Sequence, residues 1–475
     1  MFRVRRRFAT RLSAALATTG LLAAGAIATA APAAADEQNP GGATATLANN
    51  GALLKEESGS AIIELGGKER TVGAGLFQLD VDGGGSLKTY CIDIFTGTKP
   101  GAKYRETSWE QSSLQGNKDA GKILWILKNS YPQVNDLAKL ADAADVPSLN
   151  AKQAAAGTQV AIWRLSDHVK VKAADESANK LADYLEKNAQ TLQEPKASLA
   201  LEPAAVSGKA GEKLGPIKVS TSASNATVAL DQAAAGKGVK VVDKDGKPVT
   251  SAVNGSELYL DVPADAPEGS ATLTVKVTTE LSVGRAFTSI GVKSQTQILA
   301  GTSASTVEAT ATANWGAADH KGPLPAVTAE KNCVKGGLDI TVDNTKGTQE
   351  FVFSLGGKEH TIGAGKSETV FLPVKEDEAY KVEISLPDGG KEVFEGVLDC
   401  KTESTTGATT GGGEPSSEPS PASAGGSSGD TTGPDLAETG SSSATPVIAG
   451  IAVALVVVGG AAVFLLRKRK SAASE

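Results

Sequence analysis

The sequence predicts a multidomain protein: an α+β head, all-β domains behind it, a disordered stalk and one C-terminal transmembrane helix. Three observations lead to this prediction. A chain of 475 residues is too long for a single hydrophobic core. Helical spacing of apolar residues mixes with strand patterns up to residue 194, and strand patterns alone dominate from there to residue 401. Residues 402–435 are then almost wholly Gly, Ser, Thr, Pro, Ala and Glu, a composition that cannot bury a core.

Residues 1–35 are expected to be a secretion signal. Five arginines stand within the first eleven residues, and residues 12–31 carry no charge. Ala33-Ala34-Ala35 matches the small-residue rule for cleavage, so the cut is expected between Ala35 and Asp36. Two alternatives remain open: export by a twin-arginine route, which the adjacent arginines permit, and retention as a membrane anchor. The Ala-rich apolar run and the cleavage pattern favour the ordinary secretory route.

Residues 36–194 are expected to form the head. Short β-prone runs at 60–65, 71–81 and 87–95 are separated by glycines. Helical spacing follows at 123–131 and at 150–167, and Asp175 is a good N-cap for a further helix. Three of the four tryptophans fall in this region, which indicates a substantial core.

Two β units are expected behind the head. Residues 195–316 alternate apolar and polar residues between turn sequences, which predicts a β-sandwich of the immunoglobulin-like kind. Residues 327–401 predict a smaller β unit with first and last strands at 338–342 and 393–398. Cys333 and Cys400 flank those strands, and a disulfide between them would stabilise so small a unit by about 4 kcal/mol.

One eleven-residue segment occurs twice. The segments at 65–75 and 355–365 are identical at nine of eleven positions, and each has Gly-Gly between two β-prone runs. A repeated binding element and a reused hairpin are both conceivable. The glycine pair favours the hairpin, and no site is assigned to it.

Cys91 is the remaining cysteine of the three and has no predicted disulfide partner. It stands in Thr-Tyr-Cys-Ile-Asp, and Gln159 follows 68 residues later in Thr-Gln-Val-Ala-Ile-Trp. Together these two motifs resemble the thioester domains of Gram-positive surface adhesins. The resemblance implies an internal thioester between the Cys91 sulfur and the Gln159 side chain. It further implies covalent attachment of the protein to a surface nucleophile, most simply a lysine amine, or a hydroxyl.

Such capture happens once per molecule, so the protein is expected not to be an enzyme. One rival hypothesis makes Cys91 a protease or transglutaminase nucleophile with His168 as base, although no local signature supports that pair. Another is a non-covalent structural or binding wall protein in which Cys91 is a buried free thiol, because free cysteine packs as a small hydrophobe.

Residues 436–475 have the three-part order of a cell-wall sorting signal. The pentapeptide Leu436-Ala437-Glu438-Thr439-Gly440 precedes the uncharged residues 447–466, and four basic residues follow at 467–470. Twenty residues of helix span about 30 Å of hydrocarbon, and the basic tail is expected to stay cytoplasmic. The order resembles the LAxTG signals of high-G+C Gram-positive bacteria, which implies sortase and peptidoglycan as partners and a cell-wall location. A single-pass membrane protein is the alternative.

Charge excludes some partners. Without residues 1–35 and 441–475 the chain keeps 38 basic and 53 acidic residues, a net charge of −15 instead of −7. An acidic body argues against nucleic acid or anionic lipid as partner. Three scattered histidines, with neither HExxH nor CxxC spacing, predict no metal centre, and no cofactor is expected.

Overall fold

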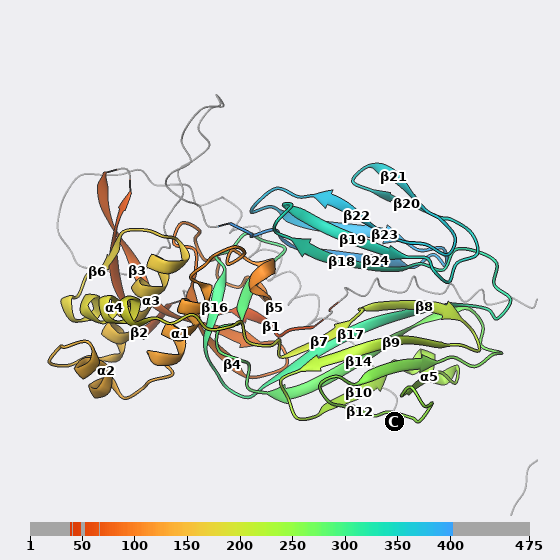
Figure 1. Ribbon diagram of the computed structural model, residues 1–475, viewed down its shortest axis with the longest axis horizontal. Helices are drawn as coiled ribbons and strands as arrows, with labels where there is room; N and C mark the ends of the chain where they lie inside the picture. Colours follow the sequence, from red (N-terminus) through yellow and green to blue (C-terminus); the bar gives the residue numbers. More distant parts are fainter. Residues whose placement is uncertain (1–38, 40, 49–52, 66, 402–475) are drawn as a thin grey trace, which may run out of the picture. The chain divides into compact units, whose positions relative to one another are not determined.

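The computed structural model describes residues 39, 41–48, 53–65 and 67–401 (Figure 1). The expected secretion signal, stalk, sorting signal and membrane span all lie outside these residues. Among the residues described, no helix is both long enough and apolar enough to cross a membrane. The described chain is mostly β-structure with few helices, in agreement with the β-rich, multidomain part of the predicted fold class.

An eight-stranded antiparallel sheet forms the centre of the head. Its strand order is β1-β5-β15-β16-β4-β3-β2-β6, and β1 also pairs with β3. The strands are β1 (Thr44–Leu47), β2 (Leu53–Leu65), β3 (Lys68–Val81), β4 (Ser86–Cys91), β5 (Lys103–Thr107), β6 (Val171–Ala173), β15 (Ala286–Ile290) and β16 (Gln297–Thr302). The expected strand at 87–95 is shorter, because β4 ends at Cys91.

The sheet of the head extends beyond the expected boundary at residue 194. Strands β15 and β16 come from the region predicted as the sandwich, yet β15 pairs with β5 and β16 pairs with β4. The alternating pattern of these strands identifies them as strands but does not say which sheet they join, since register and partner are set over long range. Residues 36–194 are therefore not the whole head.

Four helices pack beside the sheet near β2, β3 and β6 (Figure 1). They are α1 (Ala120–Asn129), α2 (Leu137–Ala143), α3 (Ala151–Ser166) and α4 (Glu176–Asn188); a short 3-10 helix, η1 (Trp109–Gln111), precedes them. Helix α3 is buried on nearly all sides. Its Gly157 allows the close approach of α4, since a Cβ there would lie 2.5 Å from the Ala178 carbonyl oxygen.

Residues 199–279 and 305–316 build two further sheets. One has the order β12-β10-β14-β17-β8 and the other β11-β13-β9-β7, and the β8–β17 pairing is parallel. The elements are β7 (Leu199–Glu202), β8 (Ala205–Lys209), β9 (Lys213–Thr221), β10 (Ala226–Leu230), α5 (Gln232–Gly236), β11 (Lys240–Val242), β12 (Ser251–Ala252), β13 (Glu257–Asp261), β14 (Gly269–Thr279) and β17 (Ser305–Gly316). Two sheets agree with a β-sandwich, and the immunoglobulin-like topology stays a prediction.

The C-terminal unit, residues 326–401, has a core of its own. Its strands are β18 (Ala326–Asn332), β19 (Gly337–Asp343), β20 (Phe351–Leu355), β21 (Lys358–Ile362), β22 (Ser367–Pro373), β23 (Ala379–Ser385) and β24 (Lys391–Val397). The predicted disulfide between Cys333 and Cys400 is confirmed. Strand β18 precedes Cys333, so the bridge joins the β18–β19 turn to the segment after β24 instead of joining the two ends of the unit.

The repeated segment is a hairpin in both places. Strands β2 and β3 pair Leu65 with Lys68, and β20 and β21 pair Leu355 with Lys358 in the same register. Gly357 has a φ of 75°, a conformation that glycine adopts without strain. The shared turn geometry thus accounts for the repeated segment.

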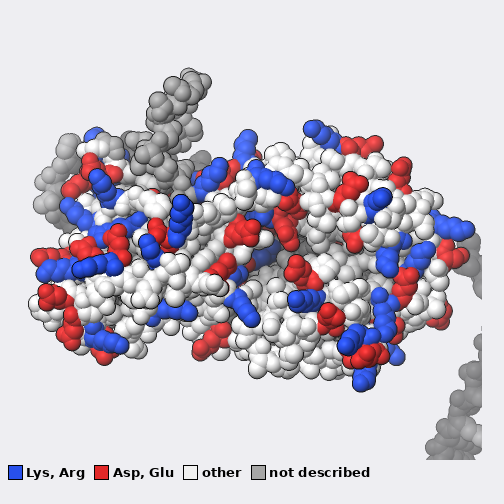
Figure 2. Space-filling model, viewed as in Figure 1, with Lys and Arg blue, Asp and Glu red and all other residues white. Residues whose placement is uncertain are grey.

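Charged side chains of both signs are interspersed over the face of the molecule shown in Figure 2. That face carries no extensive basic area of the kind that binds nucleic acid.

Candidate functional site

Cys91 is the last residue of β4 and is fully buried. It is the free cysteine of the described chain. Strand β16 lies beside it, with Gln297 opposite Cys91 and Ile298 opposite Tyr90. The sulfur is therefore held at the point where β4 ends and where the chain enters β16.

Gln159 reaches Cys91 from α3, a helix that Asn150 and Gln153 begin with a reciprocal capping box. Its Oε1 accepts the backbone N–H of Cys91 at 3.0 Å, and its Nε2 donates to the Cys91 carbonyl at 2.8 Å. Both ends of the amide are thus bonded to backbone. The structure brings the two predicted residues together, and among the described residues the hydrogen bonds of Gln159 to Cys91 go to its backbone and not to its sulfur.

The side chains that contact the sulfur belong to Gln295 and Gln297. The Cys91 thiol donates to Oε1 of Gln295, whose Nε2 donates to the Asp93 carbonyl. From the other side, Nε2 of Gln297 lies 3.2 Å from Sγ, and its Oε1 accepts from the Thr89 hydroxyl at 2.9 Å. Both glutamines are fully buried. Neither was predicted, because no local motif distinguishes them.

The surroundings of the sulfur favour the neutral thiol. Burial is the largest cause that raises the pKa of Cys91, and the charges of Asp93 and Asp167 raise it further. The hydrogen bond from Gln297 acts in the opposite direction, because it stabilises the thiolate. Any thiolate formed here would thus depend on Gln297.

Three buried carboxyl groups lie near this site. Burial raises the pKa of Asp93 to about 6 and that of Asp399 to about 7, and it raises the pKa of Asp167 well above its usual range. The charge of Asp93 adds to the shifts of Asp167 and Asp399, and the charge of Asp377 adds to the shift of Asp93. Asp93 also accepts the Phe95 backbone N–H through Oδ1 at 3.1 Å, a local turn bond that gives it a structural role.

Three other residues of the two motifs have structural roles. Tyr90, Ile162 and Trp163 are almost completely buried, so they wall the site as core residues. His168 is exposed just beyond the C-terminus of α3. Among the described residues, no hydrogen bond joins His168 to Cys91, so the pairing of a base with a nucleophile that a cysteine protease needs is not formed.

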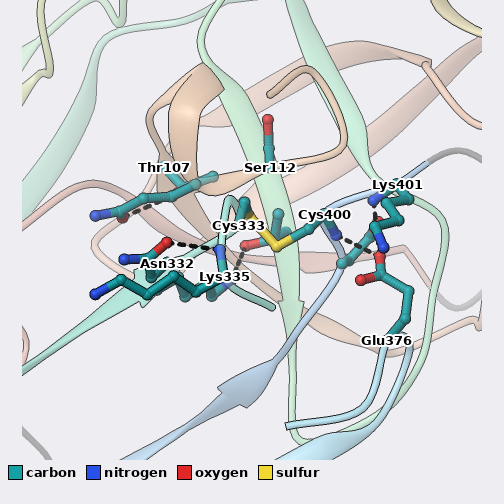
Figure 3. Close-up of a disulfide and its surroundings, with 12 residues drawn as sticks. Thr107, Ser112, Asn332, Cys333, Lys335, Glu376, Cys400 and Lys401 are labelled. Carbon is teal, nitrogen blue, oxygen red and sulfur yellow. Dashed lines mark hydrogen bonds between the residues drawn. A yellow bond between two sulfur atoms is a disulfide. The ribbon is translucent and has the colours of Figure 1, made fainter. Parts of the chain in front are cut away.

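The C-terminal unit contacts the head beside these glutamines. Thr296, between Gln295 and Gln297, donates its hydroxyl to Oδ2 of Asp399, and Nζ of Lys293 lies 2.8 Å from Oδ2 of Asp377. Asp399 is followed directly by Cys400 of the disulfide. Figure 3 shows Thr107 and Ser112 of the head beside that disulfide.

We compared the chain with known proteins. No curated protein matches it. Among solved structures, the Bacillus anthracis TIE protein is 16% identical with a TM-score of 0.26; the match covers 76% of this chain and 64% of that one. The thioester domain of the Enterococcus faecium TIE86 protein is 18% identical with a TM-score of 0.28, covering 59% of this chain and 98% of the domain. The N-terminal thioester domain of a surface protein from Clostridium perfringens is 17% identical with a TM-score of 0.21; the match covers 34% of this chain and 89% of that domain.

Cys91 and Gln159 both fall within a segment that matches a known protein family, whereas Gln295 and Gln297 lie beyond its end. The family is the thioester domain, and residues 88–191 of this chain match it.

Proposed function

We propose that this protein attaches covalently to a nucleophile on another surface, through an internal thioester between Cys91 and Gln295. One observation carries the proposal: the thiol of a free, buried cysteine contacts the side-chain carbonyl oxygen of a buried glutamine. The match of residues 88–191 to the thioester domain supports the type of chemistry.

The contacts separate the roles of the three glutamines. Gln295 presents its carbonyl end to the sulfur, and its nitrogen points to the Asp93 carbonyl. Gln297 presents its N–H to the sulfur, so it is placed to stabilise a thiolate. Gln159 holds the backbone of Cys91 by two hydrogen bonds and is a positioning residue.

The chemistry needs no atoms from outside the chain to form the bond. The Cys91 sulfur attacks the side-chain carbonyl carbon of Gln295, the C–N bond of the carboxamide breaks, and the nitrogen leaves as ammonia with the thiol proton. An amine on the target later attacks the same carbon. The C–S bond then breaks, an amide links Gln295 to the target, and Cys91 takes up a proton as a thiol.

Each molecule can react in this way once, so we propose that the protein is not an enzyme. The Clostridium perfringens relative is described as a surface protein, which supports a place outside the cell for this chain. We further propose that the C-terminal sequence anchors the protein to peptidoglycan through sortase. A lysine amine is the proposed nucleophile, and adhesion is the proposed role.

The test is the intact mass of the purified full-length chain, followed by peptide mapping. A fragment ending at residue 194 would not serve, since it lacks Gln295. We expect a mass short by one molecule of ammonia, and methylamine should reverse the deficit and label Gln295. The deficit should be absent from Cys91→Ser and from Gln295→Asn, which keeps the amide but is one methylene too short.

A full mass with a freely alkylated Cys91 would contradict the covalent mechanism and would leave a non-covalent binding or structural protein. Methylamine found on Gln159 would keep the thioester but overturn the assignment of Gln295.

A further inference from the structure

Three carboxylates of the C-terminal unit converge at its contact with the head. One oxygen each from Glu376, Asp377 and Asp399 lies within 4.8 Å of the others. Glu376 and Asp377 are half-buried, and Asp399 is only 3% exposed. Like charges this close repel one another strongly in a poorly solvated place, so their convergence needs a physical cause.

In each of the three carboxylates, one oxygen accepts a hydrogen bond or forms an ion pair with a neighbouring group. Oε1 of Glu376 accepts the backbone N–H groups of Cys400 and Lys401, at 2.6 and 2.7 Å (Figure 3). Lys293 holds Oδ2 of Asp377, and the Thr296 hydroxyl holds Oδ2 of Asp399. These bonds fix the directions of the carboxylates, as outer contacts do for metal ligands.

The second oxygen of Asp399 is the unusual atom. Oδ1 is buried and has no hydrogen-bond partner, although an unpaired buried acceptor costs about 1–3 kcal/mol. A cation bound to Oδ1 would satisfy both the lone pair and the charge.

The spacing fits one ion. Ca²⁺ binds six to eight oxygens at about 2.3–2.6 Å, so two oxygens of one ion are at most about 5.2 Å apart. The 4.8 Å separation meets that limit. The cluster contains oxygen donors only, which favours a hard cation over zinc or copper, and water would complete the coordination.

We propose that Glu376, Asp377 and Asp399 bind a hard divalent cation, Ca²⁺ by preference. The three carboxylates follow no sequence motif, because Asp399 is more than twenty residues away from Glu376 and Asp377. The disulfide of Cys400 fixes the backbone next to Asp399, so the ligand positions are preformed. The site does not depend on the proposed thioester.

The test is calorimetric titration of the full-length chain with CaCl₂ after treatment with EDTA and desalting. We expect one Ca²⁺ per chain with a Kd of about 10⁻⁴–10⁻³ M, the range of extracellular modules, and weaker binding of Mg²⁺. Asp399→Asn and Asp377→Asn should each weaken binding at least about tenfold, by loss of a charged ligand. Asp388→Asn, an exposed turn residue of the same unit, should bind like the unchanged protein.

Thermal unfolding with and without Ca²⁺ provides a second readout. Ca²⁺ should raise the Tm of the unchanged chain and of Asp388→Asn but not that of Asp399→Asn. If Asp399→Asn does not fold, Glu376→Gln and Asp377→Asn decide the question. No heat of binding in the unchanged chain, or equal binding in all the ligand variants, would overturn the proposal.

Discussion

The thiol of Cys91 meets the side-chain carbonyl of Gln295 across 204 residues of sequence. Two structural elements make the contact: the end of β4, which carries Cys91, and the segment leading into β16. The segment leading into β16 follows β15, and Arg285 stands directly before β15. The Arg285 guanidinium lies 2.9 Å from Glu106 of β5, with side chains only 6% and 0% exposed.

Replacing Arg285 with Met should destabilise the head. Glu106 would stay buried without its cation, and breaking one partner of a buried ion pair costs about 3–5 kcal/mol. Urea unfolding of the full-length chain measures the loss. Lys276→Met is the matched control, since the Lys276–Glu308 pair is half exposed and should change the free energy of unfolding by less than about 1 kcal/mol. Equal effects of the two variants would contradict this account.

Gln159→Met separates positioning from acyl transfer. Met keeps the length of the side chain but leaves the backbone N–H and C=O of Cys91 unpaired, at a cost of about 1–3 kcal/mol for each group. The free energy of unfolding should fall, while folded molecules keep the ammonia deficit. Gln295→Asn should abolish the deficit instead, and it should also lose stability, because it removes a covalent link between residues 204 apart in the sequence. A deficit that disappears in Gln159→Met and survives in Gln295→Asn would return the thioester to Gln159.

The local parts of the head could be predicted from the sequence because local patterns specify them. Asn150 begins α3 and Asp175 begins α4 through side-chain bonds to backbone N–H groups three residues later. The Cys333–Cys400 pairing could be predicted because the two cysteines flank one short β unit. Each inference needed only residues near in sequence or very few candidates.

The partner of the sulfur could not be predicted in the same way. Gln295 lies in a short segment of Ser, Gln and Thr without a motif, and its place is set by the pairing of β16 with β4. Sheet pairing over 200 residues leaves no local signal. Gln159 carried the motif, and its motif reflects its bonds to the Cys91 backbone.

The stability of the protein should fall as pH rises from about 4 to 6, partly because of Asp93. Its folded-state pKa is about 6, against about 3.9 in an unfolded chain. Within this window the folded state holds a proton that the unfolded state has released, so raising the pH favours unfolding, by about 2–3 kcal/mol in total. Above pH 6 this contribution levels off.

Asp93→Asn should make that decline shallower. Urea unfolding at pH 4, 5, 6 and 7 gives the slope for the variant and for the unchanged chain. Asp388→Asn, with its exposed carboxylate replaced, should keep the original slope. An unchanged slope in Asp93→Asn would show that other groups cause the decline.

Access to the proposed thioester should depend on Thr296. Gln295 and Cys91 are fully buried, so an amine reaches them only when the surrounding contacts open. Thr296→Val keeps the shape but removes the bond to Asp399, which is worth about 0.5–1.5 kcal/mol. Methylamine should therefore consume the ammonia deficit about 2 to 12 times faster. Thr341→Val is the control: it removes a hydroxyl contact with Thr369 inside the C-terminal unit and should leave the rate unchanged. An unchanged rate in Thr296→Val would mean that the amine reaches the site by another route.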